Sequence, residues 1–250
     1  MATEKLYLTD AYCFGNEAEV LEAAGREVVF DATCFYPGGG GQPPDSGSIS
    51  IPNELEIRVE SCSKTADGRI MHHLTDEAPM ALAGKRCCLR LDAKRRLAIM
   101  RYHTALHVFN TVMLRAFDGW ITGAGMEADY AHLDFKVENY TDEMRARLES
   151  EVNDVLSRNL PIRDYYIPED EFRSRQDLLR TLEAAPPIEN GRLRVVEITG
   201  FEAQACGGTH VKNTSEVGRL SITKVRSKGR INRRFYLALT LPHVQHPTVL

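Results

Sequence analysis

The sequence lacks a long apolar run, a cysteine framework and a large net charge, and each absence excludes a class of protein. No apolar stretch approaches the roughly 20 residues of a membrane-spanning helix, and the first five residues lack the apolar core of a signal peptide. The six cysteines do not repeat at regular spacings, so we expect reduced thiols rather than a disulfide scaffold. We therefore expect a cytoplasmic protein without membrane segments.

The charge of the chain is close to balanced, at a formal net value of −4. No general field therefore attracts nucleic acid, and an RNA partner would have to be held by a local basic patch. The strongest such patch is the segment 224–234, which carries six cations in eleven residues. A charge run is usually a solvated face, but it can also bind a phosphate backbone, and both interpretations stay open. The candidate RNA contacts are Lys224, Arg226, Lys228 and Arg230.

The 250 residues are enough for two ordinary domains. Residues 1–91 contain short, partly alternating apolar segments separated by glycines, which predicts strands in a small β-barrel or sandwich. Residues 92–250 mix helix-like and strand-like patterns, so the predicted fold class is α+β. The change of pattern at Leu91–Asp92 is the predicted domain boundary. Within the first domain, residues 17–24 are predicted as a turn of helix.

Capping residues and periodicity predict the elements of the second domain. Asp92 caps a helix over residues 93–117, and Thr141 caps a second helix that ends before Pro161. The other predicted elements are a strand over 131–138 with His132, Asp134 and Lys136 on its polar face, a short helix over 169–181, a loop at 186–187, a buried strand over 194–198, and a hairpin of 219–225 with 231–241.

Two histidines lie four residues apart in the first of these helices. Residues at this spacing project from the same helix face, one turn apart, so both imidazoles can bind one cation. A cysteine and a third histidine repeat the spacing across two glycines, which let a loop bend enough to bring both ends to one metal. Zinc takes four tetrahedral ligands from histidine nitrogen and cysteine sulfur. The pattern predicts a Zn²⁺ site formed by His103, His107, Cys206 and His210.

Either pair alone arises often by chance, so the weight of the prediction lies in their combination. The alternative is ordinary core histidines and a small buried cysteine, but only a metal site uses both pairs. Zinc can lower the pKa of water and polarise a carbonyl, which favours hydrolysis. Zincin peptidases carry a glutamate after the first histidine, whereas Thr104 stands here, so a peptidase is disfavoured. The residues alone leave a zinc-dependent hydrolase or a structural zinc site.

A glycine-rich segment with the sequence YPGGGGQPPDSG occupies residues 36–47 of the first domain. It lacks the Lys-Ser/Thr ending and the following helix of a phosphate-binding P-loop. The segment is either a mobile loop between strands or a backbone that approaches a ligand closely, with Gln42 as its polar contact.

The histidine pair, the Cys206–His210 motif and the glycine-rich segment occur in the order found in freestanding alanyl-tRNA editing proteins of the AlaX type, which the chain resembles over nearly its whole length. They are also similar to the editing domain of alanyl-tRNA synthetase and, more distantly, to that of threonyl-tRNA synthetase. The metal motifs are common to all three groups, whereas the glycine-rich segment is typical of alanyl-type proteins with an N-terminal barrel. We recognise no synthetase catalytic domain, and we expect no extra helical domain after Leu241.

This resemblance implies a β-barrel (1–91) followed by a two-layer α/β editing domain (92–250) that hydrolyses the ester of mischarged tRNA(Ala). The substrate would be chiefly seryl-tRNA, with glycyl-tRNA as an alternative. It further implies that the four matched residues bind zinc and that the glycine-rich segment lies towards the editing pocket. The candidate substrate contacts are Gly39, Gly40, Gly41 and Gln42.

An editing site is needed because a synthetic pocket rejects an isostere with an added hydroxyl only weakly. An editing pocket can instead form a hydrogen bond to the hydroxyl of serine, and Thr104 and Gln42 are the candidate partners. Two roles of zinc stay open. The ion either activates water or holds the substrate amino group. Two other functions also stay open, an RNA-binding protein with a structural zinc and a general zinc-dependent esterase. The oligomeric state stays open as well.

Overall fold

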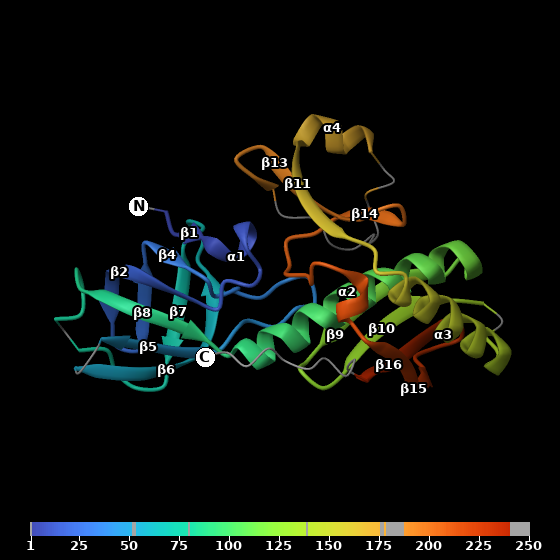
Figure 1. Cartoon of the computed structure of the whole chain (residues 1–250), viewed down its shortest axis with the longest axis horizontal. Coiled ribbons are helices and arrows are strands. Elements are labelled where there is room, and N and C mark those ends of the chain that lie inside the picture. Colours follow the sequence, from blue (N-terminus) through green and yellow to red (C-terminus); the bar gives the residue numbers. More distant parts are fainter. Residues whose placement is uncertain are drawn as a thin grey trace. The chain divides into compact units, whose positions relative to one another are not determined.

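The structure is a computed structural model, and it describes residues 2–51, 54–79, 81–138, 140–175, 178 and 188–240. The chain folds into two compact units, Met1–Leu97 and Ala98–Leu250. Strands occur in both and the longer helices follow the barrel (Figure 1), so the predicted α+β class is confirmed. The domain boundary predicted at Leu91–Asp92 and the two-layer arrangement of the second domain stay predictions. Among the described helices, none combines the length and apolar character needed to cross a membrane.

Six strands of the first unit close into a barrel, in the order β2-β3-β7-β6-β5-β8. The barrel strands are β2 (Gly15–Ala24), β3 (Glu27–Phe30), β5 (Gly47–Ile51), β6 (Leu55–Lys64), β7 (Ile70–Leu74) and β8 (Arg86–Leu91). A parallel pair, β1 (Glu4–Lys5) with β4 (Ala32–Thr33), and the short helix α1 (Leu6–Thr9) complete the unit.

Alternating side chains fill the barrel. In β6, Ile57 and Val59 point inward, and a bulge after Val59 shifts the register so that Cys62 is the next buried residue. Bulges of this kind bend a strand and increase its twist, which helps a sheet to close. All six cysteines of the chain are free thiols, as predicted.

The prediction of a helical turn over residues 17–24 is wrong, because these residues belong to β2. Their glutamates and alanines favour a helix in isolation. In the structure, however, Ala18 and Val20 are buried while Glu17 and Glu19 are exposed, which is the period of a strand. Pairing with both β3 and β8 therefore outweighs the local propensity. Helix α1 has no counterpart among the sequence predictions.

The second unit contains two sheets, one in the order β15-β16-β10-β9 and one in the order β11-β13-β12 with β14 beside β13. The strands are β9 (Trp120–Met126), β10 (Ala131–Lys136), β11 (Ile162–Pro168), β12 (Ile188–Glu189), β13 (Arg192–Ile198), β14 (Glu202–Ala205), β15 (Arg219–Ser227) and β16 (Asn232–Thr240). The helices are α2 (Ala93–Phe117), which starts in the first unit, α3 (Asp142–Ser157) and α4 (Glu169–Ser174).

Both long helices are confirmed at the predicted positions. The Asp92 carboxylate accepts a hydrogen bond from the Arg95 amide (3.0 Å), and the Thr141 hydroxyl accepts one from Met144 (3.2 Å), as expected of N-caps. Residues 102–113 of α2 are buried without interruption, so its histidine pair lies inside the unit rather than on a surface stripe. The predicted strands over 131–138 and 194–198 and the C-terminal hairpin are also present.

The short helix predicted over 169–181 ends earlier, at Ser174. Residues 176–177, 179–187 and 241–250 lie outside the described residues. The predicted loop at 186–187, the last residue of the predicted hairpin and the expectation for the segment after Leu241 therefore stay predictions.

The sequence predicts Asp134 on the polar face of β10, and this prediction is wrong, because the residue is only 5% exposed. Its carboxylate accepts hydrogen bonds from Arg234, directly opposite on β16 (2.7 Å), and from Lys228 (3.0 Å). Burial by itself would raise the pKa of this carboxyl, but the two cationic donors outweigh it and hold the pKa below its ordinary value. Two cations of the basic segment thus neutralise a buried charge.

Candidate metal centre

The structure brings the four predicted metal ligands to one point in the second unit. Their ligand atoms all lie within 4.8 Å of one another. His103 and His107 come from successive turns of α2, and Cys206 and His210 come from the loop that follows β14. The three histidines are buried and Cys206 is half-buried, so a cation here would be largely removed from water.

Two of the distances within this group match those around a tetrahedral ion. A tetrahedral zinc with bonds of about 2.3 Å to sulfur and 2.05 Å to nitrogen places each sulfur–nitrogen pair about 3.6 Å apart. The Cys206 sulfur lies 3.5 Å from Nε2 of His103 and 3.4 Å from Nε2 of His210. The donor set of three imidazoles and one thiolate suits zinc or another borderline transition metal.

Electrostatics favour the thiolate form of Cys206. Burial by itself would raise the pKa of the thiol, but His103, His107 and His210 together hold it well below its ordinary value. The Gly208 amide donates to the sulfur at 3.4 Å, which further stabilises a negative charge there. The site therefore offers an ionised ligand before any metal arrives.

The histidine pKa values split inside the cluster. Burial would lower the pKa of His107, but Cys206 and then Glu202 raise it to about 9. Burial together with the charges of the other two histidines holds the pKa of His210 well below its ordinary value. These shifts favour a protonated His107 beside an ionised Cys206, with His210 neutral.

Two polar side chains lie next to the Nδ1 atoms of two of the histidines. The Thr104 hydroxyl lies 3.1 Å from Nδ1 of His210, and the Glu202 carboxylate lies 3.3 Å from Nδ1 of His107, without the alignment of a hydrogen bond. In both cases Nε2 is left to face the metal position, an arrangement common around protein-bound zinc. Thr104 is fully buried, and its predicted contact with a substrate stays a prediction.

The loop that carries Cys206 is fixed by Arg194 of β13. The Arg194 guanidinium donates to the carbonyls of Cys206 (3.2 Å) and Gly208 (2.8 Å), and Asp164 balances its charge at 3.1 Å. Sequence reasoning identified neither this arginine nor Glu202. A signal existed for Glu202, because residues 202, 204 and 206 project from one face of an extended strand.

If the site holds a metal, replacement of Thr104 by valine is expected to weaken metal binding about 10- to 100-fold, the usual effect of removing an outer partner of a metal-bound histidine. Thr104→Ser should keep most of the affinity, because the hydroxyl remains. The measurement is competition for zinc against a chromogenic chelator.

Thr111 provides the matched control for this substitution. It is buried on the same helix, and its hydroxyl has no hydrogen-bond partner among the described residues. Thr111→Val should therefore leave the metal affinity unchanged. Equal affinities for Thr104→Val and Thr111→Val would show that Thr104 does not orient His210.

The glycine-rich segment belongs to the first unit, where its tip forms a tight turn. Gly39 and Gln42 pair through two backbone hydrogen bonds of 3.0 Å, and Gly38 to Gly41 all have positive φ angles, from 59° to 129°. Four such angles in succession require glycine. Gly39, Gly40 and Gly41 are exposed and Gln42 is buried, and their contact with a substrate stays a prediction.

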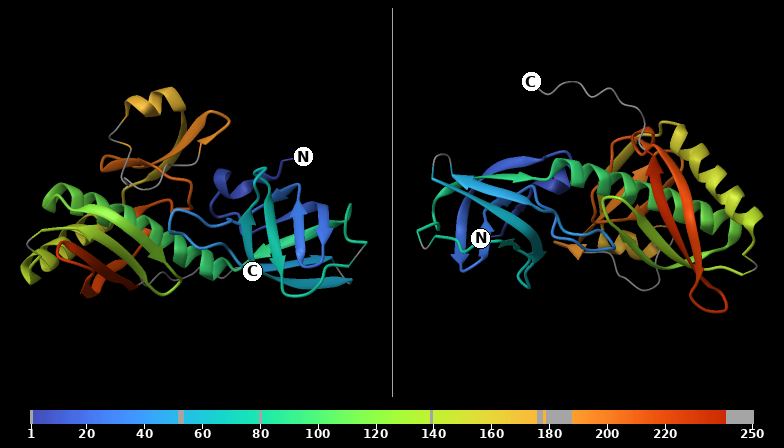
Figure 2. Two further views of the ribbon diagram at one scale, coloured as in Figure 1. Left: turned by 180° about the vertical axis from the view of Figure 1, so that it is seen from behind. Right: turned by 90° about the horizontal axis from the view of Figure 1, so that it is seen from below.

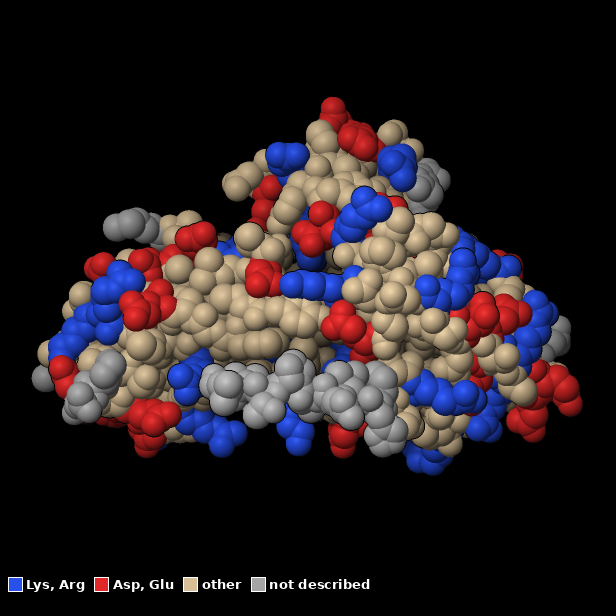
Figure 3. All heavy atoms as spheres, in the orientation of Figure 1, with Lys and Arg blue, Asp and Glu red and all other residues tan. Residues whose placement is uncertain are grey.

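The basic segment forms the hairpin of β15 and β16 (Figure 2, right, red). Lys224, Arg226, Lys228 and Arg230 are all exposed, and Lys228 also donates to the buried Asp134. Cations and carboxylates are interspersed over the face shown in Figure 3, in keeping with the balanced net charge. Any phosphate contact would therefore be local, and the predicted RNA contacts stay predictions.

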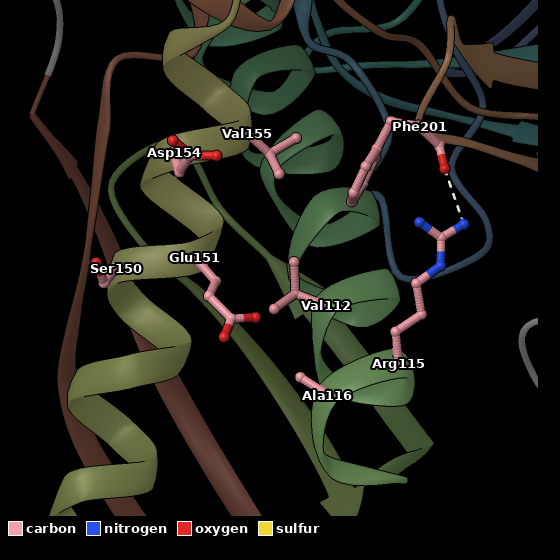
Figure 4. A pocket seen from close by; sticks show the side chains of 8 residues that line it. All are labelled: Val112, Arg115, Ala116, Ser150, Glu151, Asp154, Val155 and Phe201. Atoms are coloured by element: carbon pink, nitrogen blue, oxygen red, sulfur yellow. Dashed lines mark hydrogen bonds between the residues drawn. The ribbon is translucent and has the colours of Figure 1, made fainter.

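A surface pocket between α2 and α3 is separate from the ligand cluster (Figure 4). It is lined by Val112, Arg115, Ala116, Ser150, Glu151, Asp154, Val155 and Phe201. Its arginine donates to the carbonyl of Phe201 at 2.8 Å, so the cation is already engaged. None of the four candidate metal ligands lines this pocket.

Three buried imidazoles and one half-buried cysteine sulfur on an α+β scaffold form a site that could hold a transition metal. Two family models match the chain, "Threonyl and Alanyl tRNA synthetase second additional domain" over residues 193–236 and "tRNA synthetases class II (A)" over residues 9–95. The chain belongs to the family of alanyl-tRNA editing proteins, as the following relatives show.

The alanyl-tRNA editing protein AlaX-M of Saccharolobus solfataricus is 33% identical over 94% of this chain and 98% of its own length. That of Methanosarcina acetivorans is 36% identical over 95% of this chain and 99% of its own length. An alanine–tRNA ligase of Korarchaeum cryptofilum is 37% identical over 90% of this chain, but the match covers 25% of the ligase. The resemblance predicted from the sequence motifs is therefore confirmed.

Proposed function

We propose that this protein is a trans-editing hydrolase that deacylates mischarged tRNA(Ala), chiefly seryl-tRNA(Ala), with glycyl-tRNA(Ala) as a second substrate. The observation that carries the proposal is the convergence of His103, His107, Cys206 and His210 in a chain that matches alanyl-tRNA editing proteins over nearly their full length. The match to proteins named as alanyl-tRNA editing proteins over 98% and 99% of their own length supports an enzyme that acts in trans. We propose a cytoplasmic location for it.

The four residues would hold Zn²⁺, which supplies Lewis-acid chemistry at the ester carbonyl or a binding position for the substrate amino group. The chain's own groups prepare the site for this. The Gly208 amide and the neighbouring imidazoles favour the ionised form of Cys206, while Thr104 bonds His210 and the Glu202 carboxylate lies beside His107. Arg194 holds the loop against β13, so the ligands are preorganised rather than assembled by the substrate.

Serine differs from alanine by one side-chain hydroxyl, so selectivity for serine requires a polar group that bonds this hydroxyl. A site built to bond a hydroxyl discriminates strongly against the substrate that lacks it, because its buried polar group is then left unpaired. Gln42 and Thr104 stay the proposed partners from the sequence. An ester is also easier to cleave than an amide, so its hydrolysis does not need a carboxylate as general base. This fits the site, because the Glu202 carboxylate lies next to Nδ1 of His107 and not on the side of the metal position.

The test is the rate of deacylation of seryl-tRNA(Ala) and of alanyl-tRNA(Ala) by the zinc-loaded protein. Rapid loss of serine with alanine retained would establish a selective editing hydrolase. Cleavage of small serine esters as fast as seryl-tRNA would instead favour a general zinc-dependent esterase. A folded, zinc-loaded protein that cleaves neither charged tRNA would favour an RNA-binding protein with a structural zinc.

The exposed hairpin cations are proposed to bind the tRNA backbone. We expect Lys224→Gln combined with Arg226→Gln to raise KM for seryl-tRNA(Ala) about tenfold with little change in kcat. The salt dependence of binding should fall by about one unit of slope for each phosphate that the variant no longer neutralises. Arg147→Gln is the control, because Arg147 is an exposed cation on α3 that is paired with Glu151. An identical salt slope for the double variant and the control would contradict this role.

A further inference from the structure

One row of side chains crosses the second sheet of the second unit and ends at the metal centre. Tyr166 of β11 lies directly opposite Arg194 of β13. On the other side of β13, the Cys206 amide donates to the Arg194 carbonyl at 3.0 Å, which continues the pairing of β13 with β14 by one residue. Neighbouring strands are about 4.8 Å apart, so the Cα atoms of Tyr166 and Cys206 are separated by about 10 Å.

The three residues of this row project from the same face of the sheet, because directly paired residues share a face. The opposite face carries Leu193 and Val195. These form a small core with Ile167 of β11 and Phe172 of α4. Tyr165 belongs to that opposite face, since it pairs with Val195. Figure 1 shows α4 on one side of β11 and β13 and α2 on the other, and α2 carries His103 and His107. Tyr166 therefore shares the metal-facing side of the sheet with Cys206.

Tyr166 is 39% exposed, although its neighbours in the row are committed to other contacts. Arg194 is only 8% exposed and is used by the Cys206 loop and Asp164. Arg192 fixes the backbone of Tyr166 by a hydrogen bond of 3.2 Å to its carbonyl. An aromatic ring on an anchored strand, half open to solvent beside a reaction centre, is a suitable surface for a flat ligand.

We propose that Tyr166 is the stacking surface for the terminal adenine of the tRNA while the aminoacyl ester lies at the metal centre. This inference rests on the proposed function. In a charged tRNA the ester is carried by the ribose of the last nucleotide, so one sugar separates the ester carbonyl from the base. A spacing of about two strands between Tyr166 and Cys206 is of that order. Stacking tolerates any base, so Tyr166 supplies affinity and placement rather than base recognition.

The experiment compares two non-hydrolysable inhibitors, the 3′-seryl-amide of 3′-amino-3′-deoxyadenosine and the same seryl-amide on a ribose without a base. Both are tested against deacylation of seryl-tRNA(Ala). Wild type should bind the adenine-bearing inhibitor about 10- to 100-fold more tightly, the range that base–aromatic stacking supplies. Tyr166→Phe should keep this preference. Tyr166→Ala and Tyr166→Leu should reduce the preference for the adenine-bearing inhibitor to less than about threefold. The leucine variant keeps an apolar side chain but lacks the aromatic ring, so it tests whether the ring itself is needed.

Tyr165→Ala is the matched control, since Tyr165 is the adjacent residue with nearly equal exposure (38%) on the opposite face. It should keep the wild-type preference for the adenine-bearing inhibitor. All variants should retain one equivalent of zinc, because none of the contacts described for Tyr166 is with a candidate ligand.

The outcomes separate this inference from the proposed function. A wild type that deacylates seryl-tRNA(Ala) but binds both inhibitors equally overturns the role of Tyr166 alone. The same holds if Tyr166→Leu and Tyr165→Ala change the preference equally. A wild type that deacylates no charged tRNA overturns the proposed function and this inference together.

Discussion

Cys206→Ala is expected to lose the bound metal and to reduce deacylation of seryl-tRNA(Ala) by more than the 10- to 100-fold typical of removing an outer-shell partner. The substitution removes the one anionic ligand of the site. It leaves three imidazoles in a buried space, where their protonated forms repel one another. The Gly208 amide and the Arg194 bonds to the loop would then have no thiolate to position.

The measurement is zinc content after dialysis together with the deacylation rate. Wild type stripped with a chelator should behave as the variant does, and added zinc should restore wild type but not Cys206→Ala. Cys88→Ala is the control, because Cys88 is a half-buried thiol on β8 of the barrel. A Cys206→Ala protein that keeps one equivalent of zinc and the wild-type rate would remove Cys206 from the site.

The parts of this protein that sequence predicts well are those decided by local spacing. Asp92 and the apolar period fix α2, and a separation of four residues on that helix is enough to put His103 and His107 on one ion. The pair Cys206 and His210 follows the same logic in a loop. These predictions need no knowledge of which strand pairs with which.

The parts that sequence predicts poorly depend on distant partners. Residues 17–24 become a strand because β3 and β8 flank them. Asp134 is buried because Arg234 and Lys228, about 100 residues away along the chain, neutralise it. Glu202 and Arg194 support the metal ligands only because β13 and β14 pair next to α2. Charge and helix propensity describe each residue alone, whereas these roles belong to pairs.

The second large expected effect concerns a buried ion pair of the first unit. Arg96, in the first turn of α2, and Asp45, at the end of the glycine-rich segment, are both almost completely buried. The guanidinium donates to the Asp45 carboxylate at 3.0 and 3.1 Å and also to the carbonyls of Ala11 and Cys34. Asp45 in turn accepts from the Tyr36 amide at 2.7 Å, so one pair ties both legs of the glycine-rich turn to the barrel.

We expect Asp45→Asn to destabilise the first unit by about 3–5 kcal/mol, because the variant leaves the arginine charge buried without its counterion. Glu54→Gln is the control. Glu54 forms an exposed ion pair with Lys85 in the same unit, and surface pairs of this kind contribute at most about 1 kcal/mol.

Two buried thiols next to the pair make the effect measurable for this unit alone. Cys34 and Cys62 are at most 2% exposed, and burial raises the pKa of Cys34 to about 12 and that of Cys62 further. Both thiols therefore react with alkylating reagents only after the barrel opens. Mass spectrometry of the labelled peptides should show that Asp45→Asn raises the labelling rates of both cysteines by at least about 100-fold, since each 1.4 kcal/mol is a tenfold change in the open population.

The same experiment decides whether the pair stabilises the unit or only places the glycine-rich turn. If Asp45 acts on global stability, labelling of Cys34 and Cys62 rises together with that of Cys87, which is buried on β8. If it acts only on the turn, Cys34 and Cys62 become reactive while Cys87 stays protected, because their contacts to Arg96 and Tyr36 are the ones that loosen. Protection of all three cysteines equal to wild type would show that the buried charge finds another partner, and the ion pair would then have no structural role. We expect the first pattern, because an unpaired buried guanidinium is relieved only when the barrel admits water.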